Sequence, residues 1–145
     1  MGLGTHLGLI LVYLGGSIGF NSWLIKGFMD TISPSLDEAA KVDGATDYQI
    51  FSKIIAPLSR PILVVIFVIT FIGIYSDFIL AAIFLKDKNL WTVAVGINTV
   101  FIDDFNADWG VIAASSVIAA TPIAVLFVFF QKQITGGLTA GSVKG

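Results

Sequence analysis

The stretch that decides the fold is Glu38-Ala39-Ala40-Lys41-Val42-Asp43-Gly44-Ala45, which runs on to Ile54-Ile55-Ala56-Pro57-Leu58. It is the longest polar-to-mixed interval between hydrophobic segments, and it is too short and too charged to span a bilayer. Its turn chemistry still predicts ordered structure. Ser33-Pro34 predicts a helix start with proline at the first helical position, and Gly44 predicts the end of that helix in a left-handed conformation. We therefore expect two short helices joined at a glycine corner.

The caps of these two helices leave one alternative open. Ser35 and Glu38 fit the S-x-x-E capping box, which would start the first helix later. Thr46 and Gln49 fit a second box and predict a second helix that ends near Pro57. Neither helix would be stable alone, because each is shorter than about 12 residues. We expect the second to pack on a membrane domain through its apolar face, and the first to enter a cleft of a partner through its small residues.

Composition excludes most other classes of protein. The chain has 145 residues, of which 56% are hydrophobic and 12% charged, against about 25% charged in a soluble domain. Its mean hydropathy of +0.91 also indicates a membrane protein. A net charge of −2 argues against a nucleic-acid partner, which requires a basic surface. There is no cysteine and one histidine, so the sequence predicts no metal, no cofactor and no catalytic site.

Three intervals are long and apolar enough to span a bilayer: residues 7–25, 61–85 and 110–130. Lysine and arginine gather on the cytoplasmic side of membrane proteins. Six of them lie in the loop 27–60, at its edge or in the tail 131–145, against two in the loop 86–109. The sequence therefore predicts a cytoplasmic loop at 27–60, an outer loop at 86–109 and a cytoplasmic tail at 131–145.

The second predicted span contains a carboxylate, Asp77. A charge inside a membrane is costly and usually functional. Continuous helical spacing would place Thr70, Gly73, Asp77 and Ala81 on one small, polar stripe. Two interpretations stay open: Asp77 lines or gates a solute pathway, or it makes a structural hydrogen bond to a neighbouring helix.

Several other patterns are weaker. Gly15 and Gly19 form a GxxxG pair that would let a helix approach closely, and Pro122 is expected to kink the third span. The acidic residues of the outer loop do not match the calcium-loop pattern, and the glycine-rich tail lacks the lysine of a nucleotide-binding loop. The acidic residues concerned are Asp103, Asp104 and Asp108.

The order of residues in the opening stretch resembles a known motif. Glu38-Ala39-Ala40, Asp43-Gly44-Ala45, Ile54 and Pro57-Leu58 are similar to the EAA motif of permease subunits of ATP-binding-cassette importers. Ala56 stands where that family commonly has leucine. Tyr75-Ser76-Asp77-Phe78 and the ending 137–145 also resemble these permeases, most closely those of maltose/maltodextrin importers, so the resemblance covers nearly the whole chain.

The resemblance implies an all-α membrane protein with a MetI-like permease fold, in which three transmembrane helices carry a pair of short cytoplasmic coupling helices. The coupling helix would lie in a cleft of a cytoplasmic ATPase dimer, where Glu38 would meet a basic residue and Gly44 would set the corner. The residues implied in coupling are Glu38, Ala39, Ala40, Asp43, Gly44 and Ala45. Those implied near the ATPase in the tail are Gly137, Thr139, Gly141 and Lys144.

The resemblance also implies partners and a location. They are a second permease subunit, an extracytoplasmic solute-binding protein that delivers a maltodextrin-like carbohydrate, and the bilayer of a bacterial or archaeal cell membrane. ATP hydrolysis would occur in a partner, so this chain would not be an enzyme. Since such subunits carry about six helices, three spans suggest a C-terminal half.

Two other functions remain as alternatives. The chain could be a channel or carrier that uses Asp77 without an ATPase, or an assembly fragment that transports nothing by itself. The first predicts solute flux without an ATPase subunit. The second predicts co-purification with an ATPase without uptake.

Overall fold

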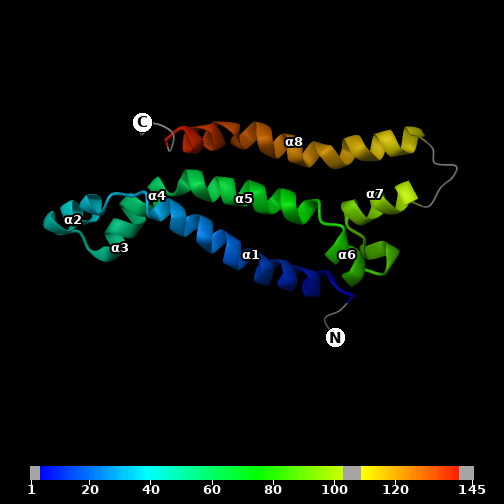
Figure 1. Ribbon diagram of the computed structural model, residues 1–145, viewed down its shortest axis with the longest axis horizontal. Helices are drawn as coiled ribbons and strands as arrows, with labels where there is room; N and C mark the ends of the chain where they lie inside the picture. The colour runs from blue at the N-terminus through cyan, green and yellow to red at the C-terminus, as the bar shows by residue number, and fades with distance from the viewer. Residues whose placement is uncertain (1–3, 103–108, 141–145) are drawn as a thin grey trace. The chain divides into compact units, whose positions relative to one another are not determined.

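The computed structural model describes residues 4–102 and 109–140, all of whose regular elements are helical (Figure 1). Asp103, Asp104 and Asp108 of the outer loop, and Gly141 and Lys144 of the tail, lie outside the described residues. The elements in chain order are α1 (His6–Met29), α2 (Pro34–Val42), α3 (Asp47–Ile50), the π-helix η1 (Phe51–Ile55), α4 (Ala56–Leu58), α5 (Arg60–Tyr75), α6 (Ile79–Phe84), the 3₁₀-helix η2 (Lys88–Leu90), α7 (Val93–Ile102) and α8 (Trp109–Ala140).

Two of the described helices are long and apolar enough to cross a membrane. They are α1 and the Trp109–Gln133 part of α8, which contain the predicted intervals 7–25 and 110–130. A third span exists only if Asp47–Leu58 and Arg60–Tyr75 count as one, although they meet at a bend of 59°. These findings confirm an all-α architecture with two to three candidate spans, while the sidedness of the loops stays a prediction.

The interval 61–85 is not one helix, which corrects the sequence analysis. Helix α5 ends at Tyr75 and α6 begins at Ile79. Asp77 lies in the break, and one of its carboxylate oxygens accepts a hydrogen bond from the backbone N–H of Ala81 at 3.3 Å. An aspartate that bonds nearby backbone offers the chain an alternative to the regular helix. Residues 70, 73, 77 and 81 therefore do not share one helical stripe.

The third predicted span belongs to a longer helix. Helix α8 continues through Pro122 and past residue 131 as far as Ala140, so the first ten residues of the predicted cytoplasmic tail are helical. Helix propagation is favourable once a long helix exists, because each added residue gains a hydrogen bond without a new nucleation cost. The glycines of this segment weaken the helix but do not end it there.

The chain divides into two compact units, whose boundaries run through α1, α5 and α8. The first comprises residues 1–18 and 68–129, and its core is formed by Leu9 of α1, Ala81 of α6, Leu85 and Val95 of α7. The second comprises residues 19–67 and 130–145 and contains the EAA-like segment. Each candidate site described below lies within one unit.

Candidate functional site

Helix α2 begins at Pro34, the earlier of the two starts that the sequence predicts. Ser33 occupies the N-cap position in an extended conformation, and Pro34 is the first helical residue. The alternative capping box of Ser35 and Glu38 does not form; instead the hydroxyls of Ser33 and Ser35 lie 2.7 Å apart. Because the helix starts before Ser35, Glu38 is left outside any cap and its carboxylate is exposed.

The end of α2 is a Schellman motif built from the EAA-like residues themselves. The backbone N–H of Ala45 donates to the carbonyl of Ala40 at 3.0 Å, and that of Gly44 donates to Lys41 at 3.0 Å. This 6→1 and 5→2 pair requires a left-handed residue between them, and Gly44 has φ +79°. The predicted glycine corner is confirmed, and Ala40 and Ala45 gain a structural role in it.

The second helix begins at the predicted capping box. The Thr46 hydroxyl accepts from the Gln49 backbone N–H at 3.4 Å, and the Gln49 side chain accepts from the Thr46 N–H at 3.0 Å. An exposed ion pair of 3.7 Å between Lys41 and Asp47 also crosses the corner. Two consecutive caps therefore fix the path of the chain from α2 into α3.

The apolar face of the second helix is only partly buried in this chain. Ile50 is buried, whereas Tyr48 and Phe51 are 78% and 56% exposed. A π-helical turn follows from Phe51 to Ile55, and it has more residues per turn than an α-helix, so side chains after it depart from regular α-helical spacing.

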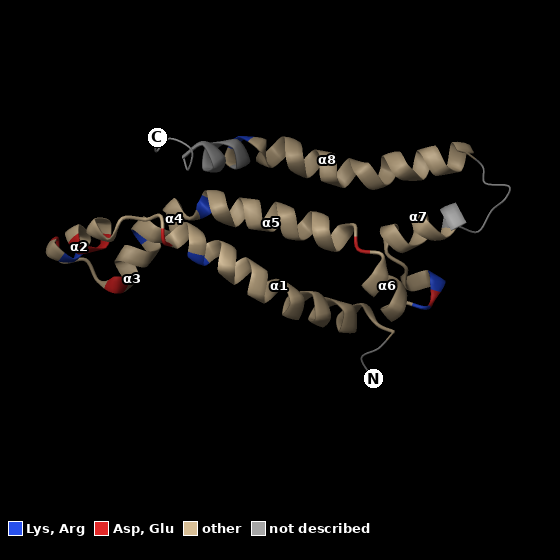
Figure 2. Cartoon of the chain, viewed as in Figure 1, with Lys and Arg blue, Asp and Glu red and all other residues tan. Residues whose placement is uncertain are grey.

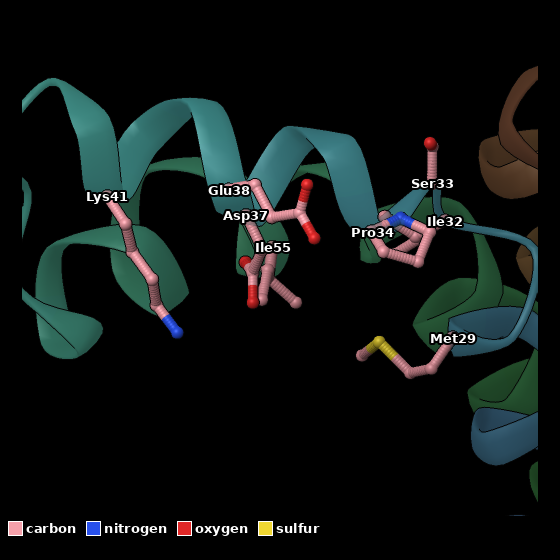
Figure 3. A pocket seen from close by; sticks show the side chains of 8 residues that line it. All are labelled: Met29, Ile32, Ser33, Pro34, Asp37, Glu38, Lys41 and Ile55. Carbon is pink, nitrogen blue, oxygen red and sulfur yellow. The ribbon is translucent and has the colours of Figure 1, made fainter.

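A pocket of about 460 Å³ lies beside α2 (Figure 3). Asp37, Glu38 and Lys41 reach it from α2, and its apolar wall includes Met29 and Ile55. The remaining lining residues are Ile32, Ser33 and Pro34. Among the described residues, neither acidic side chain has an ion-pair partner. The pocket therefore places two carboxylates and one ammonium group next to apolar surface.

Charged residues gather on α2 and α3, as the colouring of Figure 2 shows. Sequence reasoning missed an exposed apolar residue of α2. Val42 is 87% exposed at the end of α2, four residues after Glu38 and therefore on the same face. That spacing could have identified it. Val42 therefore adds exposed apolar surface beside the Glu38 carboxylate, and the small-residue description of this helix was incomplete.

The second candidate site lies in the other unit, at the break after α5. The Tyr13 hydroxyl of α1 donates a hydrogen bond of 2.7 Å to the carboxylate oxygen of Asp77 that also accepts from Ala81. This is the contact that the structural interpretation of Asp77 predicts. Thr70 and Gly73 are on α5 and do not join this bond, and Gly73 is exposed. Sequence reasoning missed Tyr13, which lies 64 residues before Asp77 in the chain.

Within residues 4–102 and 109–140, no three or more histidine, cysteine, aspartate or glutamate side chains form a group that could hold a metal ion. The single histidine, His6, lies 2.9 Å from the backbone carbonyl of Leu90 through its Nε2 atom. That bond ties the start of α1 to η2 within one unit, so His6 has a structural contact.

Comparison with known protein families matches residues 2–138 to the binding-protein-dependent transport system inner membrane component. The chain belongs to this family. Individual relatives are maltose/maltodextrin transport system permease proteins MalG: 47% identical in Vibrio vulnificus YJ016, 46% in Photorhabdus laumondii and 45% in Escherichia coli K12. Each match covers all 145 residues of this chain and 48% of the relative.

The chain therefore spans about half the length of these relatives. The family places it among inner-membrane transport components, in agreement with its apolar helices. The three relatives are bacterial, so the archaeal part of the expected location has no support from them.

Proposed function

We propose that this chain forms part of the permease of an ATP-binding-cassette importer and couples to a cytoplasmic ATPase through α2. The observation that carries the proposal is the α2–α3 corner. It is fixed by a Schellman motif and the capping box that follows it, yet the Glu38 carboxylate is exposed and has no ion-pair partner among the described residues. A rigid corner with an unpaired charge suits the transmission of a movement from a partner that carries a basic residue.

The surface around Glu38 supports a protein as that partner. Val42 and Ala39 are exposed on α2, and the neighbouring pocket has an apolar wall beside Asp37 and Glu38. The proposed coupling set is Glu38, Ala39, Ala40, Asp43, Gly44 and Ala45. Within it, Ala40, Gly44 and Ala45 would shape the corner, and Glu38, Ala39 and Asp43 would face the partner.

ATP hydrolysis is proposed to occur in that partner, because the chain belongs to a family of inner-membrane components of binding-protein-dependent transport systems. The other proposed partners are a second permease subunit, a solute-binding protein outside the membrane and the lipid bilayer. The names of the relatives favour a maltose- or maltodextrin-like carbohydrate as the solute. Asp77, Thr70 and Gly73 are proposed to lie near the solute pathway. In the tail, Gly137, Thr139, Gly141 and Lys144 are proposed to lie near the ATPase.

The test of this proposal is the uncoupling of uptake from ATP hydrolysis. In vesicles that contain the assembled transporter, we expect Glu38→Ala and Gly44→Pro each to reduce maltodextrin uptake about tenfold or more. Glu38→Ala removes the proposed charge contact with the partner, and Gly44→Pro disrupts the corner. Membrane insertion should be unchanged. Asp47→Ala is the matched control, since Asp47 is an exposed acidic residue of the same loop whose ion pair is weak.

The same assay separates the alternatives. Full uptake by both variants would overturn the coupling mechanism. Uptake without any ATPase subunit, abolished by Asp77→Asn, would instead support a carrier or channel. Co-purification with an ATPase without uptake by the wild-type assembly would support an assembly fragment.

A further inference from the structure

A second hollow lies in the unit formed by residues 19–67 and 130–145, away from the pocket beside α2. It is a groove of about 520 Å³ between the start of α5 and the part of α8 around residues 130–133. Arg60, Leu63, Val64 and Phe67 line it from α5, and Phe130 and Gln133 line it from α8. Its volume falls in the range of about 300–1,000 Å³ that is usual for sites that hold small molecules.

The spacing of these residues sorts the groove into a polar end and an apolar end. Positions 60, 63, 64 and 67 are i, i+3, i+4 and i+7, so all four side chains share one face of α5 over about 10 Å. Arg60 is the first residue of α5 and the helix's only charge. At the other end, the rings of Phe67 and Phe130 meet edge to face, with centroids 5.9 Å apart. One wall therefore runs from a cation to aromatic and aliphatic surface.

The charge at the polar end is not compensated within the described part of the chain. No carboxylate within residues 4–102 and 109–140 pairs with Arg60, whose side chain is exposed. Gln133 adds an amide donor at the same groove. A guanidinium can bind a phosphate through two parallel hydrogen bonds, and an amide N–H can complete that contact.

From this arrangement we infer that the groove binds one anionic phospholipid, whose phosphate contacts Arg60 and Gln133 and whose acyl chain covers Leu63, Val64 and Phe67. The apolar part is exposed, with Leu63 at 47% and Phe67 at 52%. A membrane helix ordinarily keeps such surface against acyl chains. Basic pockets between transmembrane helices bind anionic headgroups in this way.

A helix of another polypeptide is the competing occupant. It would cover the aliphatic wall equally well, but it would also bury the unpaired guanidinium of Arg60. Such a helix would therefore need a carboxylate opposite Arg60. A phospholipid has its phosphate at one end and its acyl chains at the other, which matches the polar and apolar ends of the groove. The charge of Arg60 therefore favours the lipid.

Native mass spectrometry of the membrane-extracted chain, with whatever subunits co-purify, tests the inference by titration with phosphatidylglycerol and phosphatidylethanolamine. We expect the wild type to favour phosphatidylglycerol about fivefold, which corresponds to the roughly 1 kcal/mol that one basic residue contributes near an anionic surface. Arg60→Gln should abolish this preference, and Arg60→Lys should retain it. Val64→Trp, which fills the groove but keeps the charge, should weaken the binding of both lipids.

Lys53→Gln is the matched control, because it removes a positive charge from the same unit without touching the groove. It should leave the preference unchanged. The inference is overturned if the wild type does not discriminate between the two headgroups, or if Arg60→Gln discriminates as the wild type does. It is also overturned if a photo-crosslinker placed at Leu63 in native membranes attaches to a polypeptide instead of a lipid.

Discussion

Gly44 is the residue on which the geometry of the α2–α3 corner depends. Its φ of +79° is strained for any residue with a Cβ atom, although an added Cβ would meet no other atom within 4 Å. Its importance therefore comes from backbone conformation and not from crowding. The residue type could be predicted from the sequence because only the chain's own backbone is involved.

Replacement of Gly44 by alanine should destabilise the corner by about 1 kcal/mol, since left-handed geometry costs an L-residue about 1–2 kcal/mol. Hydrogen exchange of the backbone amides of residues 39–45 should accelerate about fivefold. Gly44→Asn should be milder, because asparagine tolerates this conformation. Gly27→Ala, at a helical glycine of α1 that also has open space around it, is the control and should not accelerate exchange in the corner. Equal exchange in Gly44→Ala and the wild type would contradict this account of the corner.

At the scale of elements, the break between α5 and α6 organises the unit around Leu9, Ala81, Leu85 and Val95. Asp77 sits in this break and accepts hydrogen bonds from Tyr13 and from the backbone of Ala81. A carboxylate in an apolar surrounding is stabilised only while such donors remain. The Tyr13–Asp77 bond therefore joins α1 to the break.

Tyr13→Phe should lower the free energy of unfolding by about 1–3 kcal/mol, because it leaves a partly buried carboxylate without its shorter hydrogen bond. Thermal unfolding in one detergent or bilayer measures the difference. Tyr75→Phe is the matched control: the ring of Tyr75 stacks on Phe71, and no partner is present for its hydroxyl among the described residues. Its loss should stay below about 0.5 kcal/mol. Equal effects of the two substitutions would contradict a special role for the Tyr13–Asp77 bond.

The elements also show which features the sequence could predict. Local signals found Pro34 at the start of α2 and the Thr46–Gln49 capping box, since both depend on residues within one helical turn. The break at Asp77 was missed because hydropathy over 61–85 is continuous. Its partner Tyr13 is 64 residues away, and no local pattern encodes that pairing. The π-turn at 51–55 was missed for a similar reason, since periodicity assumes regular helix.

At the scale of the whole molecule, the chain is a family member that spans about half the length of its relatives. Much of the apolar surface of α1 and α8 is exposed. In a membrane-embedded helix, such surface contacts lipid or another subunit. The function proposed here accordingly belongs to an assembly, in which this chain supplies a coupling corner and the chemistry occurs elsewhere.

Site-specific cross-linking at α2 tests that claim most directly. The chain has no native cysteine, so Val42→Cys introduces a single, exposed thiol on the proposed docking face. In membranes that contain the assembled transporter, a short thiol-reactive cross-linker should join Val42→Cys to the ATPase subunit, and ATP should change the yield. Ile10→Cys, an exposed position of α1 in the other unit, should give no such product. Absence of an ATPase adduct from Val42→Cys in an assembly that still transports would contradict the account.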